Sequence, residues 1–195
     1  MLNLKRFLAI ALCVVVAAMG FAACAEQDDP LCLDTLTIGA SLDQVSSRLG
    51  DASRKVTDTS YEWKFPLPSG NTVVLSAYFN LDGQESLSTV YWEAYDTDAA
   101  LELAPIAVEA CTARYGAPQA YGDASELSDE LTGMYLYEEA TSDSVDLALG
   151  WVVDEGHNLL LVQMHSGDRS QTTLYFVRDG YFAEYLELYN AAMNQ

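Results

Sequence analysis

The chain has 195 residues, with 29 acidic against nine basic side chains and a net charge of −20 at pH 7. A surface with this charge repels the phosphate backbone, so the composition excludes nucleic acid as a partner. Half of the residues are hydrophobic, which is enough for one compact domain or for two small domains that share a core.

Residues 1–23 have the features of an export signal. Lys5 and Arg6 precede an apolar run at 7–18 that is too short for a comfortable membrane span, and small residues then lead to Cys24. Removal of this signal leaves seven basic residues against 29 acidic ones, a net charge near −22. A charge of this sign attracts a basic protein or a cationic ligand.

Two modes of signal cleavage fit the residues around Cys24. The sequence Phe-Ala-Ala-Cys at 21–24 resembles a lipobox, in which Cys24 receives lipid and residues 24–31 form an acidic tether. Alternatively, the small residues Ala23 and Ala25 satisfy ordinary signal peptidase, and the product is then secreted and soluble. We expect a lipoprotein that is anchored in a membrane at the cell envelope.

Four cysteines are present, and export narrows their roles. Cys13 leaves with the signal, and Cys24 is either lipidated or removed, so Cys32 and Cys111 remain. An exported domain with two remaining cysteines most simply joins them in a disulfide. The alternative is two separate buried thiols.

A short helix at 42–49 is the first element of the mature chain. Ser41 and Gln44 are spaced for a capping box, and Gly50 follows the last apolar residue, where a left-handed cap favours glycine. One apolar stripe along this helix should pack on a sheet. The stripe consists of Leu42, Val45 and Leu49.

Alternating and β-branched segments with short turns predict an antiparallel meander after this helix. The expected strands lie at 61–65, 72–79 and 85–95, with Trp63, Leu75 and Val90 on the side that faces the helix. A second helical pattern covers 99–115, and Pro105 either kinks it or begins a new helix there. Gly116 ends it.

The second half of the chain is expected to repeat this order of helix and strands. Expected strands lie at 133–139, 145–153, 158–165 and 172–178, after an acidic loop at 123–130, and a docking helix at 181–193 closes the chain. Along 145–153, a core stripe of Val145, Leu147, Leu149, Trp151 and Val153 is expected. A weak internal repeat matches Gly50 to Gly116, Tyr78 to Trp151, and the turn at 82–83 to that at 155–156.

A family resemblance rests on the first helix. Leu-Thr-Ile-Gly at 36–39, followed by Ser41, Gln-Val at 44–45 and Leu-Gly at 49–50, resembles the motif of the SmpA/OmlA-type lipoproteins of outer-membrane assembly. The same unit, duplicated, is the fold of the secreted β-lactamase inhibitor proteins. The resemblance implies an α+β fold of tandem helix-pair plus antiparallel-sheet units, with helices packed on one sheet face. These units would span residues 32–96 and 97–195, and their function would be binding.

Sites for catalysis or metal binding are not indicated by the residue pattern. His157 and His165 have no metal-ligand spacing, and the acidic runs lack the spacing of an EF-hand. Motifs for an activated nucleophile are missing from the sequence as well. We therefore expect no enzyme, no metal and no cofactor.

Aromatic residues give the best indication of a binding surface. Tyrosine and tryptophan combine contact area with a polar tip, and a sheet with one open face could present them to a partner. Alternatively, a second layer such as the C-terminal helix covers them. The candidates are Tyr78, Trp92, Tyr135, Tyr137 and Tyr175. We predict a non-catalytic binding module for a protein partner; the alternative is an envelope hydrolase or a carrier of a cationic small ligand.

Overall fold

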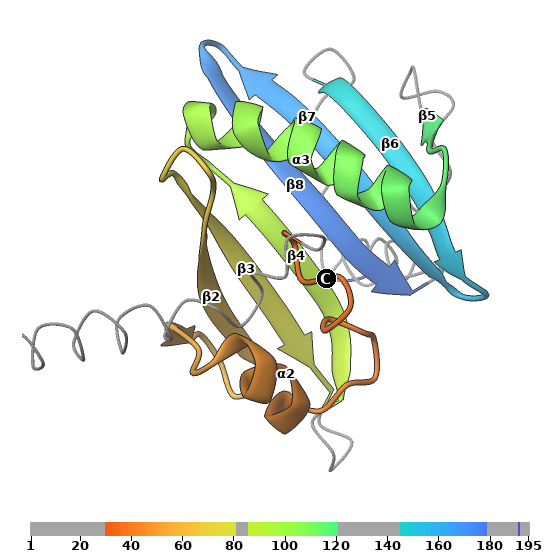
Figure 1. Ribbon diagram of the computed structural model, residues 1–195. Coiled ribbons are helices and arrows are strands. Elements are labelled where there is room, and N and C mark those ends of the chain that lie inside the picture. Colours follow the sequence, from red (N-terminus) through yellow and green to blue (C-terminus); the bar gives the residue numbers. More distant parts are fainter. Residues whose placement is uncertain (1–29, 81–85, 121–144, 179–190, 192–195) are drawn as a thin grey trace, which may run out of the picture.

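A computed structural model describes residues 30–80, 86–120, 145–178 and residue 191. Its strands form one eight-stranded sheet in the order β1-β2-β3-β4-β8-β7-β6-β5 (Figure 1). Every neighbouring pair is antiparallel. The strands are β1 (Arg54–Lys55), β2 (Ser60–Pro66), β3 (Thr72–Phe79), β4 (Leu87–Ala94), β5 (Gln119–Ala120), β6 (Val145–Asp154), β7 (His157–Ser166) and β8 (Arg169–Arg178).

The expected tandem helix-pair units are wrong, because the two halves of the chain share this single sheet. β4 from the first half pairs with β8 from the second, with Tyr91 opposite Tyr175 and Trp92 opposite Leu174. Within the described residues there are two helices, α2 (Leu42–Leu49) and α3 (Thr97–Tyr115), so neither half contributes a helix pair there. Sheet pairing across the midpoint of the chain makes the fold one continuous body.

The first helix follows the prediction closely. In α2 the Gln44 amide donates to Ser41 Oγ at 3.2 Å, and the Ser41 amide donates to Gln44 Oε1 at 2.8 Å, which completes the capping box. Gly50 ends the helix with a φ of 78°, in the region that favours glycine. Val45 is fully buried, and Leu42 and Leu49 pack beside it against the core.

Pro105 lies inside α3 without dividing it into two helices. Proline has no amide hydrogen, so it cannot bond the carbonyl of Leu101 four residues earlier. The neighbouring carbonyl of Ala100 accepts a hydrogen bond of 2.8 Å from the Thr172 hydroxyl on β8. A side chain of the sheet therefore fixes the turn of helix that precedes the proline.

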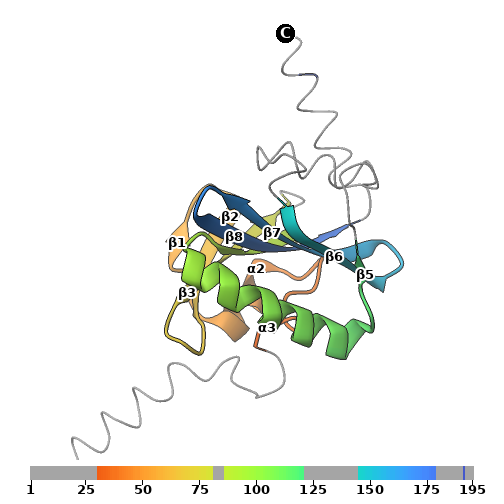
Figure 2. The ribbon, with the colours of Figure 1, turned by 90° about the horizontal axis from the view of Figure 1, so that it is seen from above.

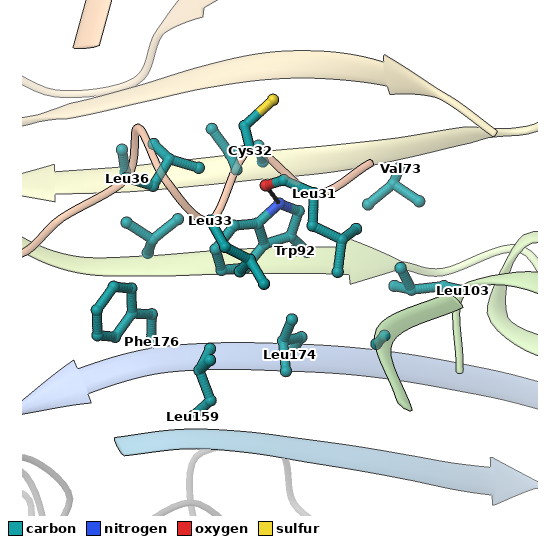
Figure 3. Close-up of a cluster of buried hydrophobic side chains, with 14 of the residues drawn as sticks. Leu31, Cys32, Leu33, Leu36, Val73, Trp92, Leu103, Leu159, Leu174 and Phe176 are labelled. Carbon is teal, nitrogen blue, oxygen red and sulfur yellow. Dashed lines mark hydrogen bonds between the residues drawn. The ribbon is translucent and has the colours of Figure 1, made fainter. Parts of the chain in front are cut away.

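Both helices lie on the same side of the sheet, as Figure 2 shows. Residues 31–36 cover the same side, and they enter the main hydrophobic cluster together with the two helices. Figure 3 shows Leu31, Leu33 and Leu36 around Trp92, whose indole Nε1 donates to the Leu31 carbonyl at 3.1 Å. The N-terminal segment is thus a third covering element of the core.

The predicted inward-facing residues are confirmed, with one exception at the start of β6. Trp63, Leu75 and Val90 are buried in the main cluster, as expected. Of the stripe predicted along β6, Val145 packs instead with the cluster on the opposite face. A register shift between Val145 and Leu147 separates it from the rest of the stripe, because an extra residue in one strand turns the following side chains to the other face.

The order of the strands is symmetrical about the β4–β8 pair, and each half runs outward to a two-residue edge strand. Gly50 and Gly116 hold equivalent places, because each ends a helix with a positive φ before such an edge strand. The proposed match of Tyr78 to Trp151 is wrong by one strand, since β3 corresponds to β7 in this order and β6 corresponds to β2. Gene duplication itself stays a prediction.

Some predicted segments lie outside the described residues. They are the loop at 123–130, the strand at 133–139, the helix at 181–193, the signal at 1–23 and most of the tether at 24–31. Among the helices of the described part, none is both long and apolar enough to cross a membrane.

The turn between β2 and β3 is held to α3 by one carboxylate. Glu102 accepts hydrogen bonds from the Ser69 amide at 2.9 Å, from the Ser69 hydroxyl, and from Asn71 Nδ2 at 3.2 Å. The bonds from the hydroxyl and amide of Ser69 lower the pKa of Glu102. The ionised carboxylate therefore ties the hairpin to the helix.

Replacing Glu102→Gln should loosen this hairpin at neutral pH. Because the pKa of Glu102 in the folded protein lies below its usual value of 4.5, the stabilisation is present above that value and is lost as the pH falls through the folded pKa. The melting temperatures of the wild type and of Glu102→Gln should differ near pH 7, and the difference should shrink as the pH falls through the folded pKa of Glu102. Glu109→Gln, on an exposed position of the same helix, is the control; a Glu102→Gln difference that does not change with pH would contradict the assignment.

Candidate binding face

The side of the sheet opposite the helices carries a row of tyrosines across three neighbouring strands. Tyr78 on β3 lies 5.3 Å from Tyr91 on β4, and Tyr91 lies 5.0 Å from Tyr175 on β8, measured between ring centroids. Tilted and edge-on contacts of this kind are the favoured arrangement of aromatic pairs. Of the predicted aromatic surface, Tyr78 and Tyr175 therefore do share one face.

The other candidates do not join this row. Trp92 is fully buried in the main cluster on the opposite side of the sheet, so its inclusion in the binding surface is wrong. Tyr135 and Tyr137 lie outside the described residues. Successive residues of a strand point to opposite faces, which is why Tyr91 takes the place that was expected for Trp92.

The tyrosine face is not open along its whole length. Tyr91 is 4% exposed and Tyr175 is 1% exposed, so the expectation of an open surface at Tyr175 is wrong. Towards the outer strands the burial decreases, since Tyr78 and Val74 are half-buried and Lys64 is exposed. The part of this face that a partner can reach therefore lies away from the central strands, over β2 and β3 and at the end of β4.

A buried carboxylate anchors an exposed tyrosine at the end of β4. Glu93 is buried, and its Oε2 accepts a hydrogen bond of 3.1 Å from Ser76 Oγ. Its Oε1 accepts a hydrogen bond of 2.5 Å from the hydroxyl of Tyr95, whose side chain is 61% exposed. The ring of Tyr95 is thus presented to solvent while its tip is fixed to the sheet.

Two further hydroxyls make this face more polar than an ordinary core. Thr89 Oγ1 and Thr173 Oγ1 are buried, and neither has a hydrogen-bond partner among the described residues. Thr173 lies directly opposite Glu93 in the register of β8 and β4. Buried hydroxyls are normally paired, so the centre of the face retains unused hydrogen-bonding capacity beside a carboxylate.

Sequence reasoning missed Tyr91, Glu93 and Tyr95. The alternation Thr89, Tyr91, Glu93 was a usable signal, because these residues share a face in any extended strand. The pairing of β4 with β8 decides which of the two faces the helices cover. Because this pairing joins distant parts of the chain, no short sequence pattern predicts it.

The predicted disulfide between Cys32 and Cys111 is not formed. Cys111 is fully buried in the main cluster and is not bonded to Cys32. The two segments still meet, because the carboxylate of Asp34 forms an ion pair with the guanidinium of Arg114, close to both cysteines in the sequence. Lipidation of Cys24 lies outside the described residues.

Each histidine faces one aspartate. Nδ1 of His157 lies 2.6 Å from Asp154 Oδ1, and Nδ1 of His165 lies 2.8 Å from Asp146 Oδ1. The two pairs are at opposite ends of the β6–β7 hairpin. Within the described ranges, no three histidine, cysteine or acidic side chains gather as they would around a metal ion.

Comparison of the chain with protein-family models, with curated proteins and with solved structures found no match. The resemblance to the SmpA/OmlA-type lipoproteins therefore stays a prediction.

Proposed function

We propose that this chain is an exported, lipid-anchored, non-catalytic module that binds a protein partner at the cell envelope. The observation that carries the proposal is Tyr95, an exposed aromatic side chain whose hydroxyl is fixed by the buried Glu93. Tyrosine supplies a large contact area and loses little conformational freedom on binding. A ring that is already held in place loses still less, which favours affinity.

The negative charge of the chain also supports binding to a protein partner. The chain carries a net charge of −20, so a basic partner would be attracted over long distances and would associate faster at low salt. Lys64 is exposed and Glu62 is half-buried on the accessible part of the tyrosine face. The surface around the tyrosines is therefore of mixed charge, while the molecule as a whole is acidic.

The binding surface can be tested by comparing how well the wild type and a variant of Tyr95 capture a partner protein. The mature chain should retain a specific envelope protein from an extract of its source, and Tyr95→Ala should weaken the measured affinity at least about tenfold, as is usual for a central aromatic contact. Val152→Ala is the matched control, because Val152 is 73% exposed on β6 but has no anchored polar tip. Equal capture by the wild type and Tyr95→Ala would contradict the assigned surface.

The lipid anchor has a separate test. An intact-mass spectrum of the mature protein from its source should show acylation on a chain that begins at Cys24, and Cys24→Ser should release the protein from the membrane fraction. A wild-type mass that corresponds to an unmodified polypeptide would contradict the anchor. That result would leave the binding surface untouched, because Tyr95 lies in the folded domain.

A further inference from the structure

A hollow of about 470 Å³ lies between residues 34–40 and the side of α2. Its walls are fixed: the Gly39 amide donates to the Leu87 carbonyl at 2.7 Å, and the Leu87 amide donates to the Ala40 carbonyl at 2.7 Å. The capping box holds the start of α2 against the same loop. The polar residues that line the hollow are Asp34, Thr35, Thr37, Gln44, Ser47 and Arg48.

The charge of this hollow differs from that of the whole molecule. The guanidinium of Arg114 donates a hydrogen bond to the carboxylate of Asp34, and this bond raises the pKa of the guanidinium. Arg48 is exposed and forms no ion pair with any described residue. Because the Asp34 charge is balanced by Arg114, the guanidinium of Arg48 is the uncompensated charge of the hollow, in a chain with a net charge of −20.

Two threonines line the same hollow as this arginine. Thr35 and Thr37 line the hollow, whereas the Ser47 hydroxyl already donates to the Gln44 carbonyl at 2.8 Å. A guanidinium presents a planar fork that matches the two oxygens of a carboxylate or of a phosphate. Hydroxyl donors at the same place add hydrogen bonds to the remaining oxygens of such a group.

We propose that this hollow is a binding site for an oxyanion, a carboxylate or a phosphate, with Arg48 as its charged donor and Thr35 and Thr37 as its hydroxyl donors. The site lies beside α2 on the helix-bearing side of the sheet, whereas Tyr95 is held by Glu93 on the opposite face. It therefore does not depend on the proposed protein-binding surface. An acidic molecule repels anions in general, so an anion that binds here does so through local contacts.

Titration of the isotopically labelled mature chain by NMR tests the site. Potassium phosphate and a tri-glutamate peptide are the two probes, each added at constant ionic strength so that screening does not change. The amide signals of Thr35, Thr37 and Gly39 should shift and saturate. Saturation with phosphate alone assigns a phosphate site, saturation with the peptide alone assigns a carboxylate site, and both together support a general oxyanion site.

Variants distinguish a built site from a general charge effect. Arg48→Gln should raise the apparent Kd at least about tenfold, and Arg48→Lys should give an intermediate value, because it keeps the charge but loses the fork. Arg54→Gln is the matched control, an exposed arginine on β1 that is paired with Glu62 at 3.7 Å, and it should bind as the wild type does. Shifts that stay linear with both probes, or equal weakening by Arg48→Gln and Arg54→Gln, would overturn the proposal.

Discussion

The hydrogen bond from the Trp92 indole to the Leu31 carbonyl joins the beginning of the folded domain to the middle of its sheet. Trp92 lies on β4, the strand where the two halves of the chain meet. α3 covers β8, where Thr172 bonds the Ala100 carbonyl, and residues 31–36 cover the surroundings of Trp92, where Leu31, Leu33 and Leu36 are all buried. Coverage of the strand around Trp92 therefore depends on a segment without helical or strand structure. The buried Trp92–Leu31 bond, the ion pair of Asp34 with Arg114 and apolar packing all hold this segment.

This arrangement bears on the proposed function. The chain enters the fold at Leu31 on the side that carries α2 and α3, whereas Tyr95 and Glu93 belong to the opposite face. The point where the chain enters the fold and the proposed binding residues therefore lie on opposite sides of the sheet.

Local features of the fold could be predicted because they depend on neighbouring residues. Ser41, Gln44 and Gly50 specify the caps of α2 within a few residues of one another. Alternation identified β2, and strand-forming composition between short turns identified β3 and β4. The β4–β8 pairing, by contrast, depends on contacts between distant parts of the chain. This pairing places Trp92 on the side that the helices cover and Tyr91 on the candidate binding face. The register shift near Val145 likewise depends on tertiary contacts that no short pattern records.

A comparison of two tryptophan variants tests the central contact most directly. Trp92 and Trp151 are both buried, but the Trp92 indole has an acceptor whereas the Trp151 indole has none among the described residues. Substitution by phenylalanine removes a similar volume in each case, and only Trp92→Phe leaves a buried carbonyl unpaired. By urea unfolding, Trp92→Phe should lower the free energy of unfolding by about 1–3 kcal/mol more than Trp151→Phe. Equal losses, or a larger loss for Trp151→Phe, would contradict the view that the N-terminal segment holds the sheet together through this bond.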